Sequence, residues 1–192
     1  MSTTALQTDR AIKSAPQNAP ALSGIWVTIA AITMAFAAFT SSLIIRQGSG
    51  DDWRHLALPG VLYLNTIVLL ASSLTLELAR RKDASSLGGT RSWLYLTFAL
   101  GVIFLAGQIF AWYQLRARGL YLATSPNSSF FYVLTMMHAL HVLGGLAGFV
   151  YAIRGTLNPF LWRTTTLDAA GTYWHFLAGL WVYLLLVLRM RL

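Results

Sequence analysis

The sequence predicts an all-α membrane protein built as a bundle of five transmembrane helices, and two observations carry this prediction. First, 56% of the 192 residues are hydrophobic and only 10% are charged, whereas charged residues make up about 25% of a soluble domain. Second, the apolar residues gather in five segments, each long enough to cross a hydrocarbon core of about 30 Å as a helix. The spans are expected at 24–45, 56–79, 93–115, 130–153 and 169–188, within one transmembrane domain over residues 23–192.

The segment before the first span differs from the rest of the chain in composition. Residues 1–22 are polar and include Pro16 and Pro20. They contain no apolar stretch ahead of a cleavage site, so they do not have the pattern of a signal peptide. We expect them to form a polar N-terminal tail that ends near the membrane surface.

The second span carries polar groups that need partners. Asn65 lies within the apolar region, where an amide without a hydrogen bond is costly, so it is expected to bond a neighbouring group. Glu77 lies near the end of the span, three and four residues before Arg80 and Arg81. Those spacings bring side chains together on a helix, so we expect an ion pair at the membrane interface. Pro59 is expected in the first turn, where proline is tolerated.

The fourth span combines histidines with a glycine-rich turn. His138 and His141 lie three residues apart and so share one helix face. One turn later, Gly144 and Gly148 form a small-xxx-small pair, with Gly145 between them, and such a pair lets another helix approach closely. An apolar helix with these features is expected to pack against partners.

This chain has few side chains that could bind a metal ion or a haem. There is no cysteine, which excludes a disulfide, a thiolate metal site and an iron–sulfur cluster. His55 is expected in an interfacial loop, and His138, His141 and His175 fall within spans. A di-haem bundle needs four well-placed axial ligands, so three intramembrane histidines are too few. We therefore expect neutral imidazoles that hydrogen-bond between helices or to lipid headgroups, and no bound metal.

The charges also exclude several functions. The net charge is +8, but the basic residues lie between apolar spans, where anionic lipid headgroups explain them better than nucleic acid. The only carboxylate within the spans is Glu77, whereas a proton pump normally shows buried acidic residues along a path. No phosphate-binding glycine loop, serine nucleophile motif or carboxylate pair occurs. The residues alone thus predict either a supporting membrane subunit or a lipid- or quinone-binding bundle, and leave both open.

Lysine and arginine residues indicate the orientation of the five spans. An odd number of spans places the termini on opposite sides, and an inner N-terminus puts eight basic residues inside against six outside, as the positive-inside rule favours. The inner set is Arg10, Lys13, Arg80, Arg81, Lys82, Arg91, Arg154 and Arg163, and the outer set is Arg46, Arg54, Arg116, Arg118, Arg189 and Arg191.

Motifs in four successive spans resemble those of a known family, subunit III of the haem–copper respiratory oxidases in its five-helix bacterial form. The second span reads LNTIVLLASSLTLELARR, similar to the family's Asn-Thr and Ala-Ser-Ser helix. The third span carries Leu100-Gly101 and Gln108 at the family's glycine and glutamine positions. The fourth reads FFYVLTMMHALHVLGG and supplies His138 and His141 to the family's H-x-x-H-V pattern. The fifth resembles a Y-W-H-F-x-x-x-x-W pattern with Tyr173, Trp174, His175, Phe176 and Trp181.

The resemblance implies a role inside a larger complex. Such a complex transfers electrons from cytochrome c to oxygen and pumps protons across the bacterial plasma membrane, where this chain would be a multi-pass protein with a cytoplasmic N-terminus. The haems and coppers belong to subunits I and II. Subunit III carries no redox centre, packs on subunit I and binds phospholipid. The residues expected at lipid or subunit contacts are Asn65, Gln108, His138, His141, Trp174 and His175, with Gly144, Gly145 and Gly148 at helix packing.

The chain departs from the family pattern at three positions. Ile32, aligned through Trp26 and Met34, stands where relatives commonly have a glutamate. Ala111 and Ala178 stand where many have a second glutamate and an aspartate. Since none of these side chains binds a proton, we expect a structural and lipid-organising role. The alternatives are the same subunit in a quinol oxidase or a nitric oxide reductase-associated complex, and a free-standing haem- or quinone-binding bundle.

Overall fold

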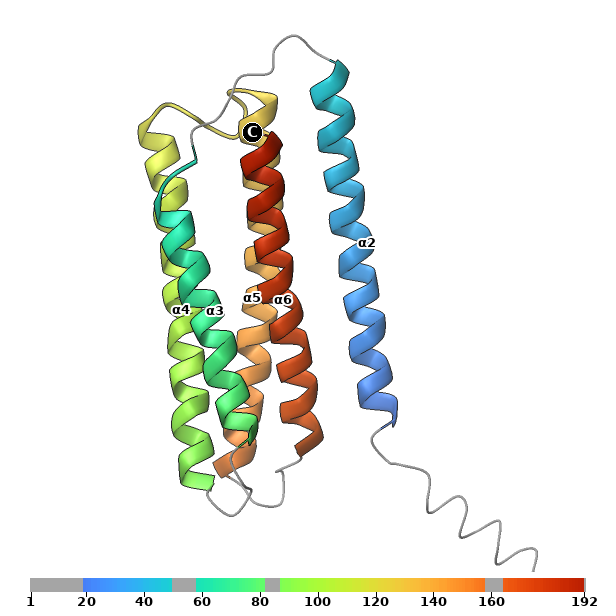
Figure 1. Cartoon of the computed structure of the whole chain (residues 1–192), viewed down its shortest axis with the longest axis vertical. Coiled ribbons are helices and arrows are strands. Elements are labelled where there is room, and N and C mark those ends of the chain that lie inside the picture. The colour runs from blue at the N-terminus through green and yellow to red at the C-terminus, as the bar shows by residue number, and fades with distance from the viewer. Residues whose placement is uncertain (1–18, 50–57, 82–86, 158–163, 192) are drawn as a thin grey trace, which may run out of the picture.

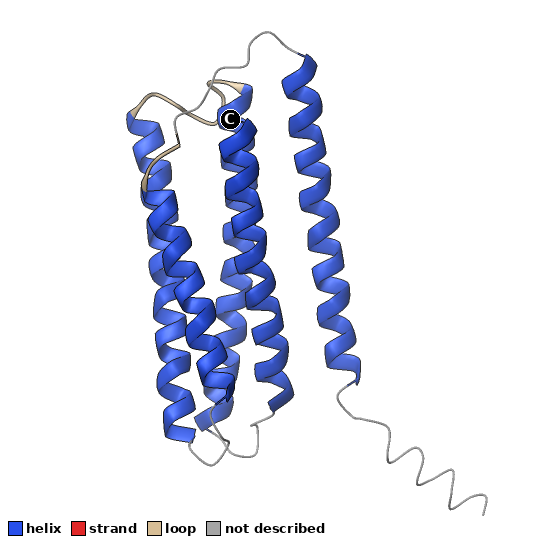
Figure 2. Ribbon diagram, viewed as in Figure 1, coloured by secondary structure: helices blue, strands red, loops and turns tan. Residues whose placement is uncertain are grey.

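Five long helices make up the computed structural model, which describes residues 19–49, 58–81, 87–157 and 164–191. Within those ranges there is no strand (Figures 1 and 2). Each helix contains a stretch long and apolar enough to cross a membrane, so the expected five-helix transmembrane bundle is confirmed. The helices are α2 (Ala19–Ser49), α3 (Val61–Arg81), α4 (Leu87–Ala117), α5 (Pro126–Leu157) and α6 (Thr164–Arg191).

The helix ends differ from the ranges expected from hydropathy. Helix α2 begins at Ala19, inside the segment expected to be a polar tail, whose residues 1–18 lie outside the described part of the chain. Helix α3 begins at Val61, so Pro59 precedes the helix, and its carbonyl oxygen accepts a hydrogen bond from the N–H of Leu62 at 3.1 Å. Helices α4, α5 and α6 extend past their expected ranges at both ends. Hydropathy locates the apolar middle of a span, whereas the helix continues into its polar flanks.

The connection from α4 to α5 is built from two capping motifs. Gly119 has a φ of 78°, and the N–H groups of Gly119 and Leu120 donate to the carbonyls of Arg116 and Leu115. This is a Schellman motif, which needs a residue that tolerates the left-handed region. At the start of α5, the hydroxyls of Ser125 and Ser128 each accept the other's backbone N–H. The two caps turn the chain sharply, and α5 runs back along α4 (Figure 1).

The helices form one bundle with α2 at its edge (Figure 1). Helix α3 packs against α4 and α6, and α5 packs against α4 and α6. The described residues of α2 contact α5 and α6, and not α3 or α4. As a result α2 is the most exposed of the five spans, whereas α5 and α6 are the most buried.

Large aromatic side chains lie in the interior, and large apolar side chains, both aliphatic and aromatic, lie on the outside. The largest fully buried side chains include Trp174 and Trp181 on α6 and Phe104 on α4. Many exposed side chains are large and apolar, which suits a surface surrounded by lipid rather than water. Examples of these exposed residues are Met34, Ile67, Ile109, Leu143 and Leu186.

Candidate functional site

The structure separates the six residues expected at lipid or subunit contacts into two groups. His141 and His175 are partly exposed, so a contact with lipid or another subunit stays a prediction for these two. The other four side chains are enclosed by this chain, and their surroundings belong to its own helices. The enclosed residues are Asn65, Gln108, His138 and Trp174.

Asn65 joins α3 to α4. Its side-chain nitrogen donates a hydrogen bond to the carbonyl oxygen of Phe104 at 3.1 Å, which confirms that this amide finds a partner. Its side-chain oxygen occupies the place where a Cβ atom of residue 107 would lie, and only a glycine leaves that place free. Gly107 therefore admits the polar side chain of α3 into the surface of α4.

Trp174 connects α6 to the centre of the bundle. Its indole N–H donates to the hydroxyl of Ser72 on α3 at 3.1 Å. Its ring lies between two glycines, because a Cβ atom built on either Gly101 or Gly145 would come within 2.9 Å of the ring. Phe149 packs on the same ring with centroids 4.8 Å apart. A large aromatic group thus fits into notches on α4 and α5 at once.

The glycine notch on α5 is made by a different residue from the expected pair. A Cβ atom at Gly148 would meet nothing within 4 Å among the described residues, and one at Gly144 would meet only the Tyr173 hydroxyl at 3.9 Å. Gly145 makes the close approach, because it points toward Trp174. Among the described residues, the close contact is thus between Trp174 and Gly145, which is itself one of the three glycines expected at helix packing. A partner helix at Gly144 and Gly148 stays a prediction.

Gln108 on α4 and His138 on α5 are both buried. The His138 ring contacts the rings of Phe104 and Trp181, with centroids 5.9 and 5.0 Å apart. The polar atoms of both side chains have no hydrogen-bond partner among the residues that the structure describes. His141 differs, since its Nδ1 lies 2.7 Å from the carbonyl oxygen of Met137 and its ring contacts Phe36 on α2.

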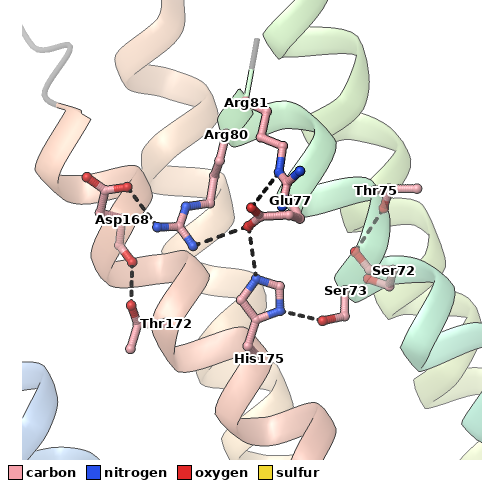
Figure 3. A network of polar contacts seen from close by, with 9 residues as sticks. All are labelled: Ser72, Ser73, Thr75, Glu77, Arg80, Arg81, Asp168, Thr172 and His175. Carbon is pink, nitrogen blue, oxygen red and sulfur yellow. Dashed lines mark hydrogen bonds and ion pairs between the residues drawn. The ribbon is translucent and has the colours of Figure 1, made fainter.

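A polar cluster joins α3 to α6 at one end of the bundle (Figure 3). The Glu77 carboxylate lies 2.9 Å from Arg81 and 3.6 Å from Arg80, so the expected ion pairs on α3 are confirmed. Arg80 also contacts the Asp168 carboxylate of α6 at 3.1 Å. We call this group the α3–α6 polar cluster; it comprises Ser73, Glu77, Arg80, Arg81, Asp168 and His175.

The contribution of α6 to this cluster was not predicted from the sequence. His175 points its Nε2 toward Glu77 at 3.7 Å, and its Nδ1 hydrogen-bonds the hydroxyl of Ser73 (Figure 3). Asp168 lies seven residues before His175, a spacing of two turns that places both on one face of α6. That spacing was readable in the sequence, but the pairing of α6 with α3 was not.

The described residues offer no group that could hold a metal ion, and some of them line an open groove. No group of three or more His, Asp or Glu side chains in the described ranges could hold a metal ion. Between α2 and α6 there is an open groove of about 400 Å³. Its lining is almost wholly apolar, which suits a hydrocarbon chain. The lining residues are Thr33, Phe36, Ala37, Phe176, Gly179, Leu180 and Tyr183.

These features define a class: a multi-pass membrane protein in which several intramembrane polar groups join one helix to another. Comparison with known families makes the assignment specific. The family model described as cytochrome c oxidase subunit III matches residues 22–190. The chain therefore belongs to the cytochrome c oxidase subunit III family.

Similar proteins occur in several bacteria. The chain is 35% identical over 120 residues to a probable cytochrome c oxidase subunit 3 of Nocardia farcinica, covering 61% of this chain and 59% of that protein. It is 34% identical over 161 residues to a cytochrome c oxidase subunit 3 of Synechocystis, covering 78% and 66%. It is 32% identical over 165 residues to the protein of the same name from Corynebacterium diphtheriae, covering 80% and 77%. The matched part thus covers less than two thirds of the length of the Nocardia farcinica protein and of the Synechocystis protein.

Proposed function

We propose that this chain is the non-catalytic third subunit of a bacterial cytochrome c oxidase. In this role it stabilises subunit I, while haem and copper in subunits I and II carry electrons from cytochrome c to oxygen and the complex pumps protons. The observation that carries the proposal is the family match over residues 22–190. The interior supports it as well, because Asn65 and Trp174 hold helices together.

A second part of the proposed function is the organisation of phospholipid. The groove between α2 and α6 supports it, since its volume of about 400 Å³ and its apolar lining suit part of an acyl chain. The edge position of α2, which contacts only α5 and α6 among the described helices, leaves this groove open on one side.

The α3–α6 polar cluster supplies a surface for lipid headgroups or for subunit I. Arg81 keeps 75% of its side chain exposed although it pairs with Glu77. A guanidinium at the end of a transmembrane span is well suited to a phosphate group. The partly exposed imidazole of His175 contacts the same Glu77 carboxylate, at 3.7 Å (Figure 3).

We further propose that the chain resides in the bacterial plasma membrane with its N-terminus in the cytoplasm. The eight inner and six outer basic residues of the sequence support this orientation. A phosphatase reporter that is active only outside the cytoplasm, fused after Leu192, should be active. A C-terminal reporter that works only in the cytoplasm would reverse the orientation.

The supporting role is tested by removing the chain from its source bacterium. The haem absorbance of the membranes should survive, because no haem ligand is lost, while the working lifetime or the assembly of the oxidase declines. Membranes that lose the oxidase haems outright would contradict a supporting role.

The lipid role is tested by filling the groove. Gly179→Phe places a ring in it, and the purified complex should retain fewer phospholipids per chain in native mass spectrometry. Gly24→Phe is the matched control, because Gly24 lies on α2 away from the groove and its Cβ would meet no described atom within 4 Å. Equal lipid retention in both variants would contradict the assignment of the groove.

A further inference from the structure

The interface of α4 and α5 encloses four polar atoms that the rest of the described chain does not satisfy. They are the two amide atoms of Gln108 and the two ring nitrogens of His138. The two side chains are 1% and 0% exposed, so neither reaches the outside of the bundle. Buried polar groups almost always have a hydrogen-bond partner, and each one left without a partner is costly.

Contacts on either side of Gln108 show that it shares an interface with His138. Phe104, one turn before Gln108, places its ring 5.9 Å from the His138 ring. Trp112, one turn after Gln108, donates its indole N–H to the hydroxyl of Thr135 at 3.0 Å. Thr135 lies three residues before His138 on α5. Gln108 is therefore held between two points at which α4 touches the same face of α5.

The surrounding aromatic rings offer this pair no hydrogen bond. Trp181 lies 5.0 Å from the His138 ring, but its N–H is already donated to the hydroxyl of Thr66 at 3.0 Å. Phe104 closes another side, with its ring edge-on to Trp181 at 5.0 Å. Phe104 therefore has no polar atom to offer His138, and the one polar atom of the Trp181 ring is already used.

We propose that at least one internal water molecule occupies this position and bridges the Gln108 amide to the His138 ring. The two side chains make no direct hydrogen bond to each other, because none of their four polar atoms has a partner among the described residues. Water carries two donors and two acceptors, so it can serve the amide and either ring nitrogen of a neutral histidine. Polar enclosures of this kind hold ordered water that forms two to four hydrogen bonds. This inference does not depend on the proposed function in the oxidase.

The two buried tryptophans of α6 allow a direct test. Trp174 and Trp181 are both 0% exposed, and each donates its N–H to a hydroxyl on α3. Of the two, Trp181 is the one whose ring contacts His138, with centroids 5.0 Å apart. X-ray pulses generate hydroxyl radicals from bound water, so radiolytic labelling of the full chain in ¹⁸O water reports water next to a buried ring. We expect Trp181 to be oxidised several-fold faster than Trp174, and equal rates would overturn the proposal.

Removing one side of the bridge locates the water. Gln108→Leu should lower the oxidation of Trp181 to the rate of Trp174, whereas Ile109→Leu on the exposed face of α4 should leave the excess unchanged. An excess at Trp181 that persists in Gln108→Leu would place the water elsewhere and overturn the assignment. If Gln108→Leu does not fold, the comparison of the two tryptophans in the unmodified chain decides the question.

Discussion

Asn65 and Gly107 fit each other across the contact of α3 and α4. The amide oxygen of Asn65 takes the place that a Cβ atom would fill at Gly107, and the amide nitrogen donates to the carbonyl of Phe104 at 3.1 Å. A polar side chain and a missing side chain together let the two helices approach closely within the membrane.

We predict that Gly107→Ala destabilises the bundle by about 1–3 kcal/mol, the usual cost of forcing extra volume into a packed interior. The added methyl group would displace the Asn65 amide and break its bond to Phe104. Thermal unfolding of the purified chain in detergent measures the effect. Gly24→Ala is the control, because its Cβ would meet no described atom within 4 Å. A melting temperature of Gly107→Ala equal to that of the control would refute the fit.

The glycines of α5 should respond in opposite directions. Gly145→Ala should cost about 1–3 kcal/mol, because its methyl group would come within 2.9 Å of the Trp174 ring. Gly148→Ala should stabilise the isolated chain by about 0.5–1 kcal/mol, since it meets open space and alanine favours the helix. The comparison is made by unfolding both variants in detergent. Equal shifts for both would show that Gly145 is not the close contact.

The two arginines of the α3–α6 polar cluster should differ in importance. Arg80 is 28% exposed and joins Glu77 on α3 to Asp168 on α6, whereas Arg81 is 75% exposed and pairs only with Glu77 among the ion pairs of the described chain. We expect Arg81→Gln to change stability by under about 0.5 kcal/mol, and Arg80→Gln to cost about 1 kcal/mol.

Asp168→Asn provides the check on this bridge. It should reproduce the part of the Arg80→Gln loss that comes from the Arg80–Asp168 contact. The double variant should cost little more than Arg80→Gln alone, because Arg80→Gln already removes that contact. If the losses of Arg80→Gln and Asp168→Asn are simply additive, the two residues are not coupled in the folded protein.

Position 32 tests whether a carboxylate belongs in this bundle. Ile32 is buried in the hydrophobic core, so Ile32→Glu should lower the free energy of unfolding by about 2–4 kcal/mol and lower the melting temperature accordingly. The substitution should not raise proton uptake by the complex. Ile32→Leu keeps the volume and serves as the control. Faster proton uptake in Ile32→Glu would show that the position can handle protons.

The sequence predicted the spans and the local pairs better than the contacts between helices. Long apolar stretches and the three- and four-residue spacings of Glu77, Arg80 and Arg81 depend only on helix geometry, and both were confirmed. The helix ends were displaced, because polar flanking residues continue a helix without raising its hydropathy.

The packing of the site could not be predicted in the same way. Whether Gly145 or Gly148 meets a neighbour depends on how α6 is rotated against α5, which no local pattern fixes. The same holds for Trp174, which the family resemblance placed at lipid or subunit contacts and which the structure buries against Ser72. The link from Arg80 to Asp168 also requires knowing that α3 lies beside α6.

The measurement that decides most directly whether this chain is a supporting oxidase subunit is its purification, tagged and full-length, from its native membranes. Mass spectrometry should find oxidase subunits I and II in the same fraction, and the optical spectrum should show their haems. After the subunits are dissociated, the haem absorbance should stay with the partners and the purified chain should show none. A Soret band on the isolated chain, or a preparation without oxidase subunits, would contradict this function.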